Sequence, residues 1–80
     1  MRVFLKISQV IGHYAPGHRQ FVAGADCDLA EGATVADLLV SLSLPVETRL
    51  LIFVNGSLAE RGCSLCHGDR VYLSQMLAGG

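Results

Sequence analysis

Apolar and polar residues alternate in two segments, one near each end of the chain. These are residues 2–7 and 70–74, and the positions on one side of each are all apolar: Val3, Leu5, Ile7, Val71 and Leu73. An alternation with a period of two places every second side chain on the same face of an extended segment. Both segments are therefore predicted to be strands that bury one face.

Residues 34–42 have the spacing of a helix instead. Their apolar positions recur at i, i+3, i+4 and i+7, namely Val35, Leu38, Leu39 and Leu42. Thr34 is a good N-cap residue, and Asp37 stands at the N3 position, where its carboxylate complements the cap. Pro45 predicts that the helix ends at or shortly before it.

A hairpin is predicted between this helix and the last strand. Residues 50–54 form a continuous apolar run, and Asn55-Gly56 follows it directly. Asn-Gly favours the type I′ turn because both central residues of that turn need positive φ. Residues 57–59 should return as a short strand, and Gly68-Asp69 should form the turn before the last strand.

The first third of the chain is less regular. Ser8 to His18 contains Gly12, Pro16 and Gly17, and this composition predicts a loop. A second strand is expected between Arg19 and Leu29, interrupted by Gly24, but its register stays open.

The predicted order is strand, strand, helix, strand, short strand, strand. One helix covers one face of a mixed sheet, so the other face meets water or a partner. If Ile52 and Val54 point toward the helix, a partner-binding face is formed by Phe4, Lys6, Phe53, Leu58 and Tyr72. Two alternatives remain open: the helix and loops cover both faces, or the strand has the opposite parity.

Composition narrows the function classes. The chain has 80 residues, of which 51% are hydrophobic and 16% charged, and a net charge of -1. These values indicate one folded domain and argue against a disordered chain or a nucleic-acid binder. No apolar run approaches the roughly 20 residues of a membrane span, and no secretory signal is visible. Together with the odd number of three cysteines, this predicts a cytoplasmic protein with reduced thiols.

The chain ends in Ala78-Gly79-Gly80. Two glycines make a thin, permissive arm that can thread a narrow channel in a partner enzyme and present the terminal carboxylate there. We therefore expect a domain over residues 1–74 and a flexible tail over residues 75–80. Met76 and Leu77 are expected either to contact the mouth of that channel or to pack on the domain.

Several short motifs, in this order and spacing, resemble the ubiquitin-like sulfur carriers, the family of the small subunit of molybdopterin synthase (MoaD) and of the thiamine sulfur carrier ThiS. The motifs are residues 34–39, Val54-Asn55-Gly56, Leu65 followed by residues 68–71, and the terminal Gly79-Gly80. The resemblance is good from about Thr34 onward and loose before it. It implies an α+β fold, the β-grasp, with a mixed sheet of four to five strands packed on one main helix.

The resemblance also implies a function and partners. An E1-like adenylating enzyme of the MoeB or ThiF type uses ATP to activate the carboxylate of Gly80, and a sulfur donor protein converts it to a thiocarboxylate. A larger synthase subunit of the MoaE type then accepts the sulfur, most simply for a molybdopterin or tungstopterin cofactor. The carrier itself binds no cofactor and supplies no catalytic residue. The alternatives are a thiamine-type carrier, a ubiquitin-like modifier conjugated through Gly80, or a non-covalent binding module.

Cys63-Ser64-Leu65-Cys66-His67 is a competing signal. It matches the C-x-x-C-H pattern of haem attachment, which needs an exported chain, and it offers Cys63, Cys66 and His67 as zinc ligands beside Cys27, His13 or His18. Zinc sites of this kind usually contain two paired motifs, and only one pair is visible. Redox pairing of Cys63 with Cys66 is a further alternative. The simplest interpretation is that Leu65 fills the core between two small spacers, and that His13 and His18 are solvated loop residues.

Overall fold

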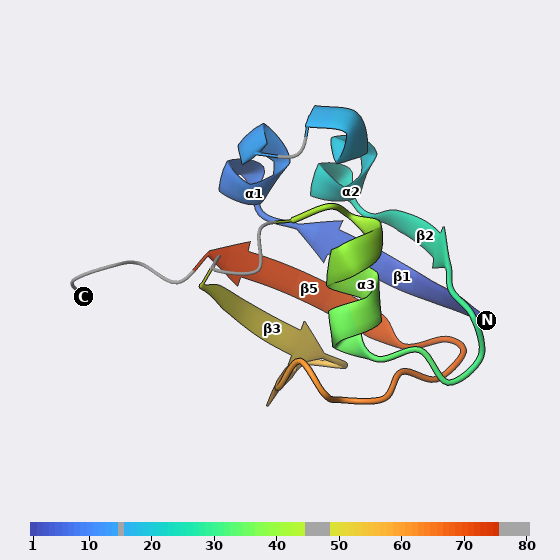
Figure 1. The fold of residues 1–80 in the computed structure, drawn as a ribbon. Coiled ribbons are helices and arrows are strands. Elements are labelled where there is room, and N and C mark those ends of the chain that lie inside the picture. Colours follow the sequence, from blue (N-terminus) through green and yellow to red (C-terminus); the bar gives the residue numbers. More distant parts are fainter. Residues whose placement is uncertain (15, 45–48, 76–80) are drawn as a thin grey trace.

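The computed structural model describes residues 1–14, 16–44 and 49–75, and its centre is a five-stranded sheet in the order β2-β1-β5-β3-β4 (Figure 1). The elements in chain order are β1 (Arg2–Ile7), α1 (Gln9–Tyr14), the 3-10 helix η1 (Pro16–His18), α2 (Gln20–Ala23), β2 (Ala25–Asp28), α3 (Val35–Ser41), β3 (Leu50–Val54), β4 (Ser57–Ala59) and β5 (Arg70–Gln75). The predicted strands and the main helix are confirmed, except that residues 20–23, expected as part of the second strand, form α2, so Gly24 precedes β2 and does not interrupt it. None of the helices in the described ranges is long and apolar enough to cross a membrane.

The two alternating strands lie side by side at the centre of the sheet. β1 and β5 are parallel, with Leu5 opposite Val71, and the other three pairs of strands are antiparallel. The sheet is therefore mixed, as predicted. β5 extends to Gln75, which pairs with Leu50, so one residue that the sequence had assigned to the tail belongs to the sheet.

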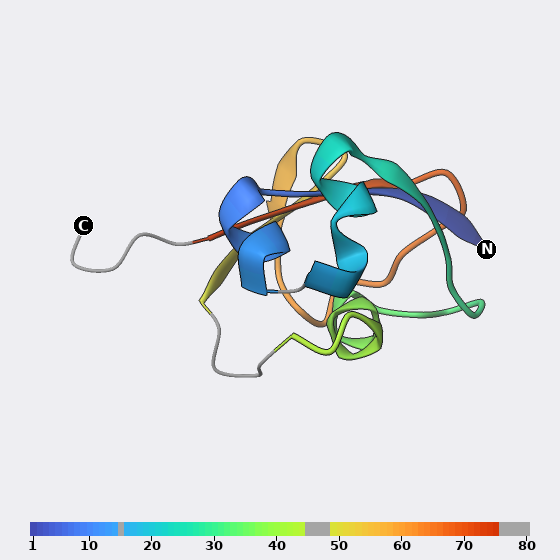
Figure 2. The same cartoon turned by 90° about the horizontal axis from the view of Figure 1, so that it is seen from above.

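The core lies between this sheet and α3. The predicted inward positions of β1 and β5 are buried, and so are the four apolar positions of the helix pattern, Val35, Leu38, Leu39 and Leu42. Ile52 of β3 is also buried, whereas Phe53 is only half-buried. The parity in which Ile52 faces the helix is thus confirmed. Figure 2 shows α3 and the two short helices on the same side of the sheet.

The start of α3 has partners for its backbone donors. Thr34 Oγ1 accepts from the Asp37 N–H at 3.3 Å, and Asp37 Oδ2 accepts from the Thr34 N–H at 2.9 Å, which completes a capping box. The carbonyls of Cys63 and Arg61 accept from the next two N–H groups, those of Val35 and Ala36. The loop after β4 is therefore fixed to the helix N-terminus.

The prediction that Ser8 to His18 is a loop is wrong. This segment contains α1 and η1, and the α1–α2 hairpin, defined here as residues 9–23, joins β1 to β2. Burial explains the difference, because Ile11 and Phe21 join the main core. Gly12 lets the helices approach closely, since a Cβ there would lie 2.5 Å from Val22 Cγ2. Gly12 thus acts in packing and does not break the helix.

The Asn55-Gly56 turn has the predicted geometry. Both residues have positive φ, 54° for Asn55 and 85° for Gly56. The Asn55 side chain also joins this turn to the start of β5, because its Nδ2 donates to Asp69 Oδ1 at 3.0 Å and its Oδ1 accepts from the Arg70 N–H at 2.9 Å. The hairpin is thereby held beside the last strand.

Candidate partner-binding face

The strand register places five predicted residues on one face of the sheet. Lys6 lies opposite Tyr72, Tyr72 opposite Phe53, and Phe53 opposite Leu58. Residues opposite each other across paired strands point to the same side, and Phe4 shares that side because it is two positions from Lys6. The open face is defined here by these five residues and Arg70, which lies opposite Phe4. No helix in the described part of the chain packs on it.

The centre of the open face is aromatic. The Phe53 and Tyr72 ring centroids are 6.3 Å apart, with an interplanar angle of 34°. Beside them, Leu58 of the edge strand is 70% exposed. Exposed apolar groups on adjacent strands form a contiguous patch, and such patches mark interaction sites on small soluble proteins.

Two cations flank this apolar centre. Lys6 and Arg70 line the same shallow hollow of about 530 Å³ as the rings of Phe4, Phe53 and Tyr72, together with Gly56 and Val71. The Arg70 guanidinium lies 5.6 Å from the Phe4 ring centroid, which is within the range of a cation–π contact. None of these lining residues is acidic. The hollow therefore suits a partner that offers an apolar anchor beside carboxylates.

Arg70 is a site residue that the sequence analysis did not select. Its place on the open face could have been predicted from the sequence, because Arg70 alternates with the buried Val71 and lies on the same side of the strand as Tyr72. Met76, Leu77, Ala78, Gly79 and Gly80, the remaining predicted site residues, lie outside the described residues. Their roles stay predictions.

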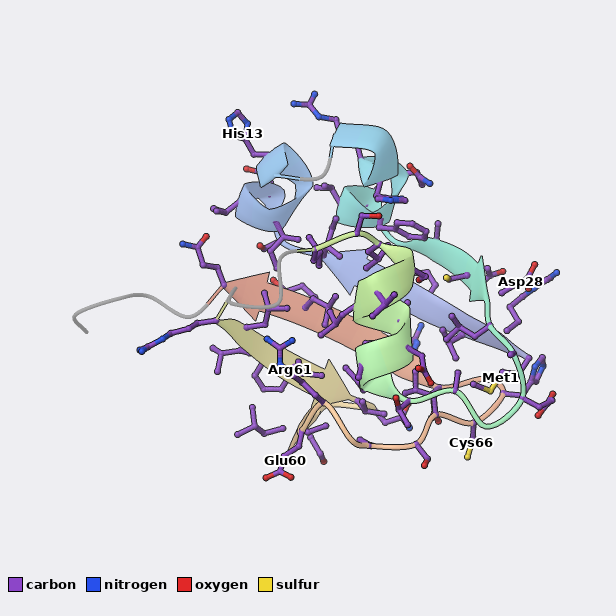
Figure 3. All side chains as sticks on the ribbon, in the orientation of Figure 1. Met1, His13, Asp28, Glu60, Arg61 and Cys66 are labelled. Carbon is purple, nitrogen blue, oxygen red and sulfur yellow. The ribbon has the colours of Figure 1, made fainter. Side chains whose placement is uncertain are left out.

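The cysteine motif is part of the structural framework. Ser64 forms an isolated bridge with Thr34, and Leu65 is buried at 3% exposure, which confirms that this residue fills the core. Cys63 packs against the core, whereas Cys66 is exposed and points away from the body of the domain (Figure 3). Within residues 1–14, 16–44 and 49–75, no group of three or more Cys, His, Asp or Glu residues could hold a metal ion.

The histidines of the motif and of the N-terminal segment have separate surroundings. His67 Nδ1 accepts from the Arg2 N–H at 3.0 Å. His18 lies in η1, and its ring centroid is 6.1 Å from that of Phe21. His13 lies at the end of α1. The prediction that both histidines are loop residues is therefore wrong.

Two pKa shifts occur at the N-terminal edge of the sheet. A hydrogen bond from Arg2 Nε to Asp28 Oδ1, at 3.1 Å, raises the pKa of Arg2, and the charges of Asp28 and Asp26 add to it. Burial raises the pKa of the Cys27 thiol, and Asp28 adds to this effect. Arg2 lies two positions before Phe4 and therefore on the same side of the sheet as the open face, whereas Cys27, opposite Val3, packs against the core.

Comparison with known proteins agrees with this geometry. The family model of the ThiS family matches residues 16–80. The chain belongs to the ThiS family. This is a family of small carrier proteins with a ubiquitin-like fold. A comparison with curated proteins gives no match.

Solved structures show the same fold. SAMP1 from Haloferax volcanii superposes with a TM-score of 0.73 at 22% identity and covers 100% of both chains. A second structure of small archaeal modifier protein 1 from H. volcanii gives 0.71 at 19%, over 95% of this chain and 98% of that one. Molybdopterin converting factor subunit 1 from Pyrococcus furiosus, as that structure is described, gives 0.74 at 22%, over 96% and 99%. The architecture is therefore the predicted ubiquitin-like β-grasp, with α1, η1 and α2 added to the main helix.

Proposed function

We propose that this protein is a sulfur carrier activated at the carboxylate of Gly80. The observation that carries the proposal is the extent of the family match, which runs from residue 16 through the terminal Gly79-Gly80. The Pyrococcus neighbour supports molybdopterin or tungstopterin synthesis as the destination of the sulfur. The chain would then act as a substrate or small non-catalytic subunit of a sulfurtransferase.

The chemistry requires two steps at one carbon atom. A carboxylate is a poor electrophile, so an E1-like enzyme of the MoeB or ThiF type first joins the Gly80 carboxylate to AMP and releases pyrophosphate from ATP. A sulfur donor protein then delivers sulfide or persulfide sulfur to the carbonyl carbon, and AMP leaves. A persulfide donor needs a thiol to reduce the resulting acyl disulfide. The product is a thiocarboxylate, whose anionic sulfur is a nucleophile for the acceptor held by a MoaE-type subunit.

In this scheme the folded domain places the Gly80 carboxylate where the partner enzymes can act on it. The open face would dock on the partner while residues 76–80 reach the partner's reaction centre. ATP and the groups that act on it belong to the partner in this scheme, so the carrier needs no nucleotide site of its own.

Intact-mass spectrometry of the protein isolated from its own cell tests the proposal. A fraction of chains in which one oxygen of Gly80 is replaced by sulfur is the expected result, and fragmentation should place the change on that residue. A deletion of Gly79 and Gly80 should remove the sulfur-bearing species. If the mass stays unaltered under active cofactor synthesis, the carrier function is wrong.

A second candidate function is a protein modifier. The Haloferax structures favour it, because SAMP1 is small archaeal modifier protein 1 of that organism. In that case the activated Gly80 would form isopeptide bonds with lysines of other proteins. Immunoblots of cell extracts would then show a ladder of conjugates that disappears when Gly80 is deleted. A terminus whose removal leaves every activity intact would instead indicate a non-covalent binding module.

A further inference from the structure

The charges of this protein are unevenly distributed along the chain. All seven Asp and Glu residues lie at or beyond position 26, so the first 25 residues contain none. The α1–α2 hairpin carries His13, His18 and Arg19 in this acid-free segment. Arg19 is the one formal charge of the hairpin, since the net charge of -1 takes histidines as neutral, and the hairpin is therefore a locally positive surface.

The hairpin lies beside the end of the sheet from which the tail begins. The Ser8 N–H at the start of α1 donates to the Leu73 carbonyl of β5 at 3.0 Å. Figure 1 shows α1 next to the end of β5, and Gln75 is the last residue of that strand. A partner that receives residues 76–80 would therefore approach the molecule next to the hairpin.

The two short helices flank an open hollow of about 310 Å³. It is lined by Gln9, Gly12, His13, Arg19 and Val22. The side chains of Gln9, His13 and Arg19 bring an amide donor, an imidazole and a guanidinium to one place, and none of the lining residues is acidic. Arg19 is exposed and takes part in neither of the ion pairs found among the described residues. A guanidinium binds a carboxylate with two parallel hydrogen bonds, so the hollow suits a carboxylate.

We infer that the hairpin is a second docking surface, and that its occupant is an Asp or Glu side chain of the E1-like adenylating partner. This inference rests on the proposed function. The open face supplies an apolar contact, whereas the hairpin supplies a charge contact at the end of the sheet where the tail begins. An acidic side chain seated on Arg19 would orient the domain so that the tail enters the partner's reaction centre.

Activation kinetics test the inference. The chain's own adenylating enzyme is supplied with ATP, and the Gly80 adenylate is followed by pyrophosphate exchange for the wild type, Arg19→Glu and Arg61→Glu. Both variants change the net charge equally, but Arg61 follows β4 at the opposite edge of the sheet from the hairpin. Thermal melts and amide NMR spectra confirm that each variant is folded. Arg19 makes no side-chain capping hydrogen bond to α2, so its replacement should be tolerated.

We expect Arg19→Glu to raise the KM for the carrier about tenfold at low salt with little change in kcat, because a reversed charge slows association. Salt should reduce the difference, since a few hundred millimolar screens exposed charges beyond several ångströms. Arg61→Glu should stay within about twofold of the wild type. Equal KM values for the wild type and Arg19→Glu would overturn the docking inference alone. No activation of the wild type would overturn the proposed function, and the inference with it.

Discussion

Gly24 occupies a position that other residues fit poorly. Its φ is +98°, and a Cβ there would lie 2.4 Å from Cζ of the Phe4 ring. The Arg70 guanidinium lies over the same ring, with its Cζ 5.6 Å from the ring centroid. Gly24, which lies between α2 and β2, therefore affects the position of a ring on the open face.

Gly24→Ala should destabilise the protein by about 2 kcal/mol, because the residue would be strained and the ring would have to move. Urea unfolding of the two proteins measures the change. Gly62→Ala is the matched control, since Gly62 has no positive φ and nothing lies within 4 Å of its Cβ position. If both variants unfold at the same urea concentration, the strain assigned to Gly24 is absent.

The three thiols should differ in reactivity. Burial raises the pKa of Cys27, so at a given pH less of it is the reactive thiolate, whereas Cys66 is exposed. Iodoacetamide should modify Cys66 first and Cys27 much later, and the rate at Cys27 should continue to rise at pH values above the ordinary range of a thiol. Peptide mass spectrometry follows each site, and denatured protein provides the control, in which the sites should react alike.

The raised pKa of Cys27 also links stability to pH. The folded state keeps the thiol proton to a higher pH than the unfolded chain does. This contribution to stability is present below the ordinary thiol pKa and is lost as the pH rises through the folded pKa. The unfolding free energy of the wild type should therefore fall in alkaline buffer more steeply than that of Cys27→Ala. Parallel pH profiles of the two proteins would contradict this.

At the scale of single elements, α3 is the helix that the sequence specified best, and its cap can be tested. Thr34→Ala removes the hydroxyl that accepts the Asp37 N–H and should cost about 1 kcal/mol. Thr34→Ser should restore most of the loss because it keeps the hydroxyl. Ser57→Ala, which deletes an exposed hydroxyl in β4, serves as the control in the same denaturant titration. Equal losses for Thr34→Ala and Thr34→Ser would rule out the capping role.

The length of each element explains which helices and strands could be predicted from the sequence and which could not. β1, β5 and α3 contain six or seven residues with a clear apolar period, and β3 is a continuous apolar run of five residues before the Asn-Gly turn. Each of these elements was predicted close to its observed bounds. α1 and α2 have six and four residues, which is too short for a helical period to appear. Their stability comes from burying Ile11 and Phe21 in a core formed by distant strands. Sequence patterns do not report such tertiary contacts.

The candidate site divides in the same way. The sequence predicted Phe4, Lys6, Phe53, Leu58 and Tyr72 on one face only on the condition that Ile52 and Val54 point toward the helix, and the strand register meets that condition. The register then added Arg70, and only the spatial arrangement of the two short helices showed the hollow around Arg19. A site built from neighbouring strands is thus easier to predict than one built from two short helices, such as α1 and α2, which pack against each other at Gly12.

At the scale of the whole molecule, the two faces of the sheet have different roles, one in folding and the other in partner binding. Its inner face holds the core against α3, and its open face presents apolar side chains that the described chain leaves uncovered. A substitution at an exposed position on the open face should therefore change binding much more than folding. Leu58 is the best such position, because its 70% exposure means that the folded domain depends little on it.

Leu58→Glu should weaken binding to the adenylating partner by about 2 kcal/mol, or roughly thirtyfold in Kd, because it places a charge where an apolar contact is buried. Val40→Glu is the matched control, since Val40 is 75% exposed but lies on α3, on the other side of the sheet. Isothermal titration calorimetry gives both affinities, and thermal melts should show both variants near the wild type.

Leu58→Lys separates the apolar contact of the open face from its positive charge. A partner with carboxylates around its apolar anchor should tolerate lysine at position 58 better than glutamate. If the two charged variants bind equally badly, the flanking cations Lys6 and Arg70 do not select an acidic partner, and the open face recognises its partner by apolar contact alone.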